Sequence, residues 1–231
     1  MKYQHLFFDL DHTLWDFESN SKAVLEKIYS DFELQEKGIP HFEIFYEIYK
    51  GHNNRLWQRY RNGYIKREEL KWKRMWLTLL DFKIANENLS REMAAVFMQL
   101  LPLQNKLFPY TFDILDYCQS KGYGLHLITN GFRDTQEKKL KSSGLESYFT
   151  HVITSEESQT MKPYPEIFYY SLNIAKASAA QSLMIGDNLE VDILGAKNIG
   201  MEQVYFNPNK IKHQEQPTFE ISNLKELELI L

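Results

Sequence analysis

The stretch that decides the fold reads HLFFDLDHTL and spans residues 5–14. It begins with a short apolar run of the kind that is typical of a buried parallel strand. Two carboxylates, Asp9 and Asp11, stand at the end of that run, one residue apart. If the chain stays extended through Asp11, both side chains point to the same side, and their crowded charges would need a bound cation. The pair could also be a solvated strand end, so its meaning depends on the rest of the chain.

Residues 16–105 carry little strand pattern and almost no glycine. Apolar residues recur there at helical spacing in four places, which predicts four helices. We expect these helices around residues 19–32, from Pro40 onward, over residues 67–82 and from a cap at Ser90 to Leu100.

From residue 106 onward, apolar runs alternate with helical patterns. This alternation predicts a parallel sheet with helices on both faces. The fold class is therefore α/β: a Rossmann-like parallel sheet flanked by helices, built from residues 1–15 and 106–231, with residues 16–105 inserted as an all-helical cap domain. Further strands are expected at residues 124–130, 151–154, 182–186, 203–206 and 219–221, a helix over 191–199, and a last helix ending at Leu231.

The composition is that of an ordinary globular protein. Of 231 residues, 43% are hydrophobic and 25% are charged, as in typical soluble domains. The net charge of −4 argues against a protein that coats nucleic acid. Cys118 is the single cysteine, so no internal disulfide can form. No apolar stretch reaches the length of a membrane span and the first strand leaves no room for a signal peptide, so we expect a soluble, cytoplasmic protein with no membrane partner and no predicted oligomeric state.

Polar groups follow each predicted core strand. Because ligands of parallel sheets bind at the carboxyl ends of the strands, we expect these groups to converge on one edge. Besides Asp9 and Asp11, they are Thr129-Asn130-Gly131, Lys162 just before a helix, and Asp187 with Asp192 one helical turn later.

The residue types in this set suit phosphoryl transfer. Carboxylates provide the oxygen ligands that Mg²⁺ prefers. A carboxylate such as Asp9 can attack phosphorus, and a second carboxyl such as Asp11 can protonate the leaving oxygen and later deprotonate water. The Thr129 hydroxyl, the backbone N–H groups near Asn130 and Gly131, and the Lys162 ammonium can bind the phosphoryl oxygens.

Each of these residues also has a plainer interpretation. Thr129 could simply end a strand, and Asn130-Gly131 is a common turn sequence. Lys162 in isolation would be a surface lysine. Asp192 could be an acid favoured by the helix dipole in a first turn. The order and spacing of the whole set, and no single motif, favour the functional interpretation.

The four motifs, in this order, resemble the haloacid dehalogenase superfamily of hydrolases in its phosphatase branch, and the resemblance covers the whole chain. The insert resembles the helical type-1 cap of that family, which implies that it closes over the substrate and selects the leaving group. The runs at residues 11–17 and 129–132 look most like the pyrimidine 5′-nucleotidase-like group.

The resemblance implies a role for each residue. Asp9 would be the nucleophile and a metal ligand, and Asp11 the general acid/base that also offers its main-chain carbonyl to Mg²⁺. Thr129 and Lys162 would hold the phosphoryl group. Asp187 would be a metal ligand, and Asp192 would support the site from beside the ligands.

The predicted function is therefore a Mg²⁺-dependent phosphatase that hydrolyses a small phosphorylated metabolite, a nucleoside 5′-monophosphate, through an aspartyl-phosphate. Alternatives with the same fold are a phosphoglycolate or sugar-phosphate phosphatase and a phosphomutase. A 2-haloacid dehalogenase would not need Asp11 and Asp187. A non-catalytic binding module would not need four intact motifs.

Overall fold

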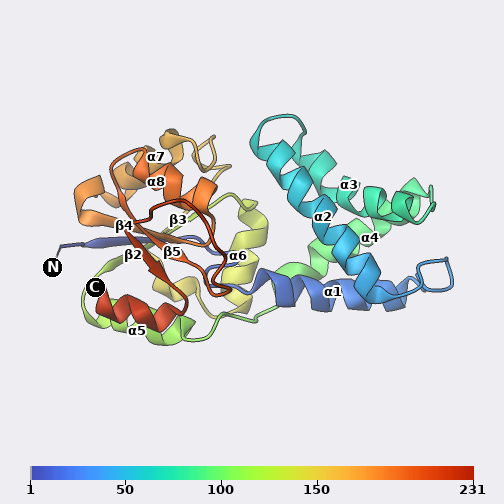
Figure 1. Ribbon diagram of the computed structural model, residues 1–231, viewed down its shortest axis with the longest axis horizontal. Coiled ribbons are helices and arrows are strands. Elements are labelled where there is room, and N and C mark those ends of the chain that lie inside the picture. The colour runs from blue at the N-terminus through green and yellow to red at the C-terminus, as the bar shows by residue number, and fades with distance from the viewer. Residues whose placement is uncertain (1) are drawn as a thin grey trace. The chain divides into compact units, whose positions relative to one another are not determined.

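The computed structural model describes residues 2–231, which form two compact units. One unit, here called the sheet unit, comprises the N-terminal residues through Phe17 together with Asn105–Leu231. The other, here called the helical unit, comprises Glu18–Gln104. Figure 1 shows the elements of both units.

The sheet unit is built on six strands in the order β3-β2-β1-β4-β5-β6. Every neighbouring pair is parallel, so all six carboxyl ends lie at the same edge of the sheet. The predicted parallel α/β sheet is confirmed. Its strands are β1 (His5–Phe8), β2 (Gly124–Thr129), β3 (His151–Thr154), β4 (Ser182–Gly186), β5 (Glu202–Phe206) and β6 (Phe219–Ile221).

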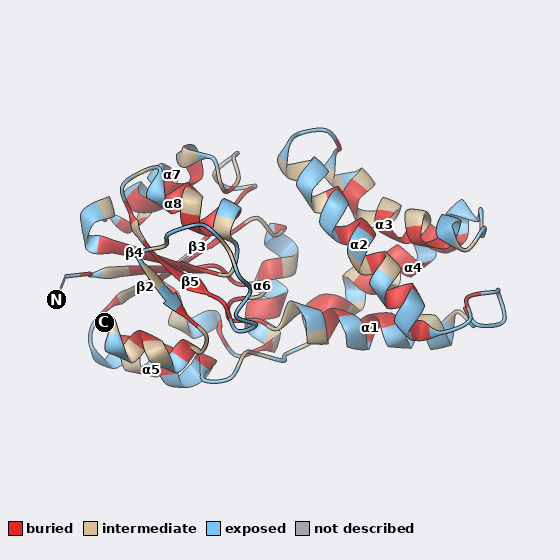
Figure 2. Cartoon of the chain, viewed as in Figure 1, coloured by how far each residue is buried: buried red, intermediate tan, exposed pale blue. Residues whose placement is uncertain are grey.

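Helices cover both faces of this sheet (Figure 1). On one face, Ile167 and Phe168 pack with strand residues such as Phe7 and Met184 in a fully buried core. Figure 2 shows the buried residues concentrated in the strands and on the helix faces that meet them. The helices are α5 (Thr111–Ser120), α6 (Arg133–Ser142), α7 (Pro165–Ala175) and α8 (Gly195–Lys197), with 3-10 turns at Glu146–Tyr148 and Ala179–Gln181.

Two predicted helices differ from the expectation. The segment expected over residues 191–199 starts earlier, as a π-helical turn at Leu189–Leu194, because the Asn188 side chain accepts hydrogen bonds from the Glu190 and Val191 N–H groups and its carbonyl accepts one from Ile193. The last helix is a 3-10 helix at Leu224–Leu229 and ends before Leu231.

The helical unit consists of four helices, as the apolar spacing predicts. Tyr49, Met75, Leu79 and Phe97 are buried at its centre, where the rings of Tyr49 and Phe97 lie 5.6 Å apart. The predicted cap at Ser90 is wrong: Asn86 caps that helix by accepting from the Leu89 N–H, and Ser90 bonds within the first turn. The helices are α1 (Phe17–Asp31), α2 (Phe42–Arg61), α3 (Arg67–Asp81) and α4 (Glu87–Leu100), followed by a 3-10 turn at Leu101–Leu103.

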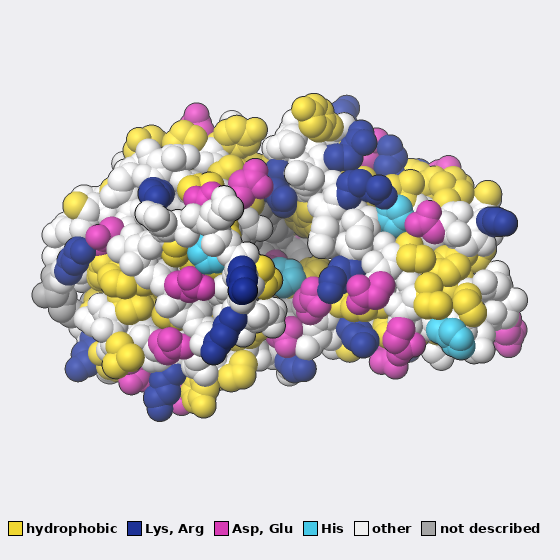
Figure 3. Space-filling view, viewed as in Figure 1, with side chains coloured by type: hydrophobic (Ala, Val, Ile, Leu, Met, Phe, Trp, Pro, Cys, Tyr) yellow, Lys and Arg dark blue, Asp and Glu magenta, His cyan; other side chains and the backbone are white. Residues whose placement is uncertain are grey.

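The surface charge is mixed. Acidic and basic side chains alternate over the visible face of the sheet unit, while basic side chains gather where α2 and α3 lie (Figure 3). Within residues 2–231, no helix is both long and apolar enough to cross a membrane.

Candidate active site

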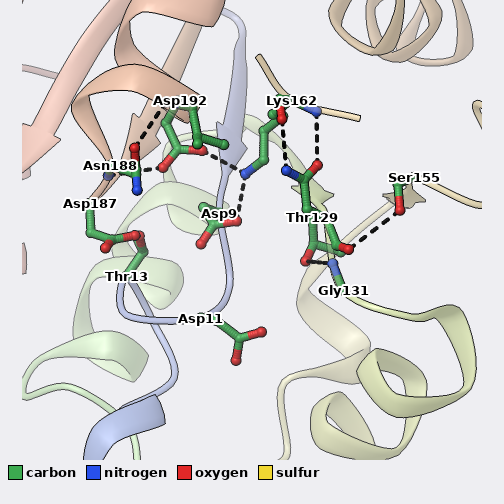
Figure 4. Close-up of polar contacts among 12 residues, drawn as sticks. Asp9, Asp11, Thr13, Thr129, Gly131, Ser155, Lys162, Asp187, Asn188 and Asp192 are labelled. Carbon is green, nitrogen blue, oxygen red and sulfur yellow. Dashed lines mark hydrogen bonds and ion pairs between the residues drawn. The ribbon is translucent and has the colours of Figure 1, made fainter. Parts of the chain in front are cut away.

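Two neighbouring strands deliver the first pair of carboxylates. β1 ends at Phe8 and Asp9 follows it, while β4 ends at Gly186 and Asp187 follows. Phe8 lies beside Ile185 in the parallel register, and the Asp9 N–H donates to the Ile185 carbonyl at 2.9 Å. Asp9 and Asp187 therefore leave the sheet side by side (Figure 4).

A third carboxylate, Asp192, comes from the π-helical turn and packs against Gly186. A Cβ atom at position 186 would stand 2.5 Å from the Asp192 carboxyl group, so only glycine allows this approach. One oxygen of Asp192 accepts a hydrogen bond from the Asn188 N–H at 3.1 Å. The other accepts one from the Lys162 ammonium at 2.6 Å. The side chain is buried and both of its oxygens are already engaged.

Lys162 lies between two of these carboxylates. Its Nζ is 2.6 Å from an oxygen of Asp9 and 2.6 Å from an oxygen of Asp192, and its residue is 1% exposed. Burial opposes the charge of Lys162, but Asp192 and Asp9 outweigh it and raise the pKa of the ammonium. The lysine is thus held charged at the centre of the site.

The remaining charge of the cluster fits a divalent cation. Asp9, Asp187 and Asp192 each offer a carboxylate oxygen, and these oxygens lie within 4.8 Å of one another. Burial raises the pKa of Asp9, with Lys162 opposing and Asp192 adding to the effect, and burial with the charges of Asp192 and Asp9 raises the pKa of Asp187. Three carboxylates against one ammonium leave an excess of negative charge. Hard oxygen donors with uncompensated negative charge are what Mg²⁺ binds.

The Asn130 side chain holds Lys162 in place. Its amide nitrogen donates to the Lys162 carbonyl at 2.8 Å, and its amide oxygen accepts from the Lys162 N–H at 2.8 Å. The neighbouring Gly131 N–H donates to the Thr129 hydroxyl at 3.0 Å. Thr129 and Lys162 are thereby fixed on the same side of Asp9 (Figure 4). The predicted binding of phosphate by N–H groups near Asn130 and Gly131 stays a prediction.

Asp11 lies apart from the carboxylate cluster (Figure 4). Strand β1 ends at Phe8, and the chain turns after Asp11: His12 takes a φ of 66°, and the Leu10 carbonyl accepts from the N–H groups of Leu14 and Trp15. One oxygen of Asp11 accepts from Lys139 Nζ at 2.6 Å and the other from Gln136 Nε2 at 3.0 Å.

Sequence reasoning missed Gln136 and Lys139. Both lie on α6 and are buried, at 0% and 2% exposure. A signal was present, because α6 has only one large apolar residue, Leu140, so polar residues had to occupy the rest of its buried face.

Comparison with known proteins confirms the predicted resemblance. The family described as haloacid dehalogenase-like hydrolase matches residues 3–200. Pyrimidine 5′-nucleotidase PynA of Streptococcus pneumoniae is 32% identical over 98% of this chain and 94% of its own length. Pyrimidine 5′-nucleotidase YjjG of Escherichia coli is 32% identical over 100% of this chain and 99% of its own.

A solved structure supports the same fold. The magnesium-bound crystal structure of the putative HAD-hydrolase YfnB from Bacillus subtilis matches with a TM-score of 0.89 and 29% identity. The match covers 100% of this chain and 99% of that chain.

Proposed function

The chain belongs to the haloacid dehalogenase-like hydrolases, and we propose that it is a Mg²⁺-dependent phosphatase acting on nucleoside 5′-monophosphates. The observation that carries the proposal is the position of Asp9. Its carboxylate is buried, is bonded to the Lys162 ammonium and belongs to a carboxylate cluster that fits a divalent cation. The nucleophile would lie beside the fixed positive charge of Lys162, and the remaining negative charge of the cluster would allow a metal cation to bind as well. This arrangement suits attack on an anionic phosphate ester.

The first step transfers the phosphoryl group to Asp9. A carboxylate oxygen of Asp9 attacks phosphorus, the bond to the ester oxygen breaks, and an aspartyl-phosphate forms. Asp11 gives its proton to the leaving alcohol. Lys162 and the Thr129 hydroxyl bind the phosphoryl oxygens throughout.

The second step restores the enzyme. Asp11 takes a proton from a water molecule, whose oxygen attacks phosphorus and releases inorganic phosphate from Asp9. Asp9, Asp187 and the main-chain carbonyl of Asp11 would hold Mg²⁺, with Asp192 keeping Lys162 in place beside them. When bound, the ion compensates the negative charge of the carboxylates and of the phosphoryl group.

The substrate class rests on the relatives. Two of them, similar along essentially the full chain, are pyrimidine 5′-nucleotidases. We therefore infer that pyrimidine nucleoside 5′-monophosphates are preferred over other phosphate esters.

A panel of phosphate esters tests this proposal. With Mg²⁺, the release of inorganic phosphate should be fastest from pyrimidine nucleoside monophosphates and slower from purine nucleotides, phosphoglycolate and hexose phosphates. A preference for phosphoglycolate or a sugar phosphate would refute the nucleotidase assignment. Transfer of the phosphoryl group to another sugar hydroxyl would indicate a phosphomutase, and halide release from a 2-haloacid in the presence of EDTA would indicate a dehalogenase.

The nucleophile has its own control. Asp9→Asn keeps the size of the side chain and removes the attacking charge, so we expect turnover to fall about a thousand-fold or more. The matched control is Asp113→Asn, because Asp113 is exposed on α5. An Asp9→Asn protein that retained normal turnover would contradict the covalent mechanism.

A further inference from the structure

The buried face of α6 carries two polar residues that the proposed mechanism does not use. Gln136 and Lys139 stand one helical turn apart, and both are almost completely buried. Burying an amide and an ammonium costs free energy unless each finds partners. The Lys139 ammonium contacts Asp11, and the Gln136 amide nitrogen contacts both Asp11 and Thr129, whereas the buried Gln136 amide oxygen has no partner among the described residues.

Gln136 determines where the Thr129 hydroxyl hydrogen points. Its Nε2 lies 2.7 Å from Thr129 Oγ1 and 3.0 Å from an oxygen of Asp11. The amide orientation is fixed because a carboxylate accepts hydrogen bonds, so the nitrogen must face Asp11. Thr129 Oγ1 also accepts from the Gly131 N–H at 3.0 Å. A hydroxyl accepts two hydrogen bonds and donates one, so the Thr129 hydrogen is left to donate to another acceptor.

Lys139 holds the other oxygen of Asp11. Its ammonium lies 2.6 Å from that oxygen, 4.4 Å from the centre of the Trp15 ring and 5.5 Å from that of Phe17. Trp15 is fully buried, and its backbone is tied into the turn that carries Asp11 by hydrogen bonds with Leu10 and His12. The aromatic faces favour the cation and fix its place. Asp11 is thus held by both of its oxygens, away from the Asp9 cluster.

We propose that Gln136 and Lys139 are positioning residues, which fix the Asp11 carboxylate and turn the Thr129 hydroxyl into a dedicated donor to the phosphoryl group. The inference rests on the proposed phosphatase function. Helix α6 would then hold the Asp11 carboxylate and the Thr129 hydroxyl at a constant separation, because the Gln136 amide nitrogen is hydrogen-bonded to both. Neither residue touches the reacting atoms, so each acts through its neighbour.

A comparison of two phosphate ester substrates distinguishes these positioning roles from a general loss of structure. p-Nitrophenyl phosphate has a leaving group that departs without protonation, whereas an alkyl phosphate needs a proton from Asp11. The second substrate is the alkyl phosphate that the unaltered enzyme hydrolyses fastest. The value of kcat/KM is measured for both, because it reports the barrier relative to free enzyme and free substrate.

Lys139→Met should act selectively. It removes the charge that holds Asp11 and keeps the length of the side chain, so kcat/KM for the alkyl phosphate should fall about 10- to 100-fold more than for p-nitrophenyl phosphate. Lys139→Arg should restore the ratio of the two values. Lys138→Met, on the exposed face of the same helix, is the matched control and should leave both values unchanged.

Gln136→Met should act on both esters. Loss of the fixed Thr129 donor should lower kcat/KM for p-nitrophenyl phosphate about 10-fold, mainly through a higher KM, and for the alkyl phosphate further still. The exposed Gln119→Met on α5 is its control. Circular dichroism confirms folding, and Lys139→Gln replaces Lys139→Met if the latter does not fold.

The results separate this inference from the proposed function. If the unaltered protein hydrolyses neither ester, the phosphatase function itself is wrong. If it hydrolyses both and Asp9→Asn abolishes turnover, but Lys139→Met lowers both values equally or neither, the phosphatase function stands and the positioning role is overturned.

Discussion

The sheet carries two clusters of titratable side chains, one toward each end of its strands, and β1 contributes to both. At the carboxyl ends of β1 and β4 lie the carboxylates around Lys162. Toward the other ends of β1, β2 and β3 lie His5, His126 and His151, whose rings stack with centroids 5.4 and 5.3 Å apart. His5 Nδ1 and His126 Nε2 are 3.1 Å apart. Neighbouring strands bring the titratable groups together in both clusters, but the carboxylates have an oppositely charged partner and the histidines have none in the part of the chain that the structure describes.

Burial favours the neutral form in both clusters. It raises the pKa of Asp9, and it lowers the pKa of His126 to about 4, with the charges of His5 and His151 adding to the effect. The carboxylates nevertheless have the Lys162 ammonium as a partner, and their oxygens could bind a cation. The neighbouring charges that lower the pKa of His126, by contrast, are those of the two other histidines. We infer that a buried titratable cluster can stay charged where partners compensate its charge, as around Asp9, and is held neutral where they do not, as around His126.

The largest effect is expected when the positive charge of Lys162, which compensates the buried carboxylates, is removed. Lys162→Met leaves Asp9 and Asp192 buried without their cation, so we expect turnover to fall about a thousand-fold or more and the free energy of unfolding to fall by about 3 kcal/mol. Phosphate release and urea denaturation measure the two effects. Lys141→Met, exposed on α6, should change neither. Normal turnover in Lys162→Met would mean that the lysine has only a structural role.

Binding of Mg²⁺ should stabilise the protein through the carboxylate cluster and not through the histidine cluster. An ion that binds only the folded state at one hundred times its Kd adds about 2.7 kcal/mol of stability, so the Tm should rise by roughly 5–10 °C. Asp187→Asn should abolish most of this rise, and EDTA should abolish turnover of the unaltered protein. His126→Phe, at the other cluster, should leave the Mg²⁺-dependent rise intact. An equal rise in the Asp187→Asn protein would place the ion elsewhere.

The smallest expected effect concerns the histidines. The pKa of His126 is about 4 in the folded state and near 6.5 in the unfolded state, so the unfolded state binds more protons between these values. Stability from the neutral ring is complete above pH 6.5 and is lost as the pH falls toward 4, by about 2 kcal/mol at pH 4.5. The raised pKa of Asp9 acts with the opposite sign, because the folded state there binds the proton more readily.

A variant isolates the histidine contribution. Urea denaturation at pH 7 and pH 4.5 should show that His126→Phe loses about 2 kcal/mol less on acidification than the unaltered protein. His213→Phe, at a site distant in sequence, is the control. An identical loss in His126→Phe and the unaltered protein would show that the stack does not set the acid sensitivity.

The positions of the main site residues follow from local pattern. Apolar runs locate the strands, and parallel pairing then brings Asp9 and Asp187 to one edge, since β1 and β4 are neighbours in the sheet. Lys162 joins them because it starts the segment that leads into α7. The positions of Asp9 and Asp187 depend on strand ends, and that of Lys162 on a helix start, both of which the sequence pattern marks clearly.

The surroundings of Asp11 could not be predicted in the same way. They depend on a tight turn in which a non-glycine residue, His12, takes a positive φ, and on an ion pair with a residue 128 positions away. Nothing in the local pattern near Asp11 indicates Lys139, because that contact arises only when α6 packs against the turn. The local sequence pattern thus locates the Asp11 carboxylate, but it does not identify Lys139, the partner far along the chain that holds this carboxylate in place.

The side-chain clamp of Asn130 on Lys162 also bears on how the protein ages. An asparagine followed by glycine is chemically labile, because the next backbone nitrogen can attack the side-chain carbonyl and release ammonia. Here that nitrogen donates to Thr129, and the Asn130 amide is held at both ends by Lys162. We expect the folded protein to resist this deamidation and the urea-unfolded protein to undergo it, as peptide mass spectrometry of stored samples would show. An aspartate formed at this position could no longer donate to the Lys162 carbonyl, so each unfolding event would expose the protein to a slow and irreversible loss of this support of Lys162.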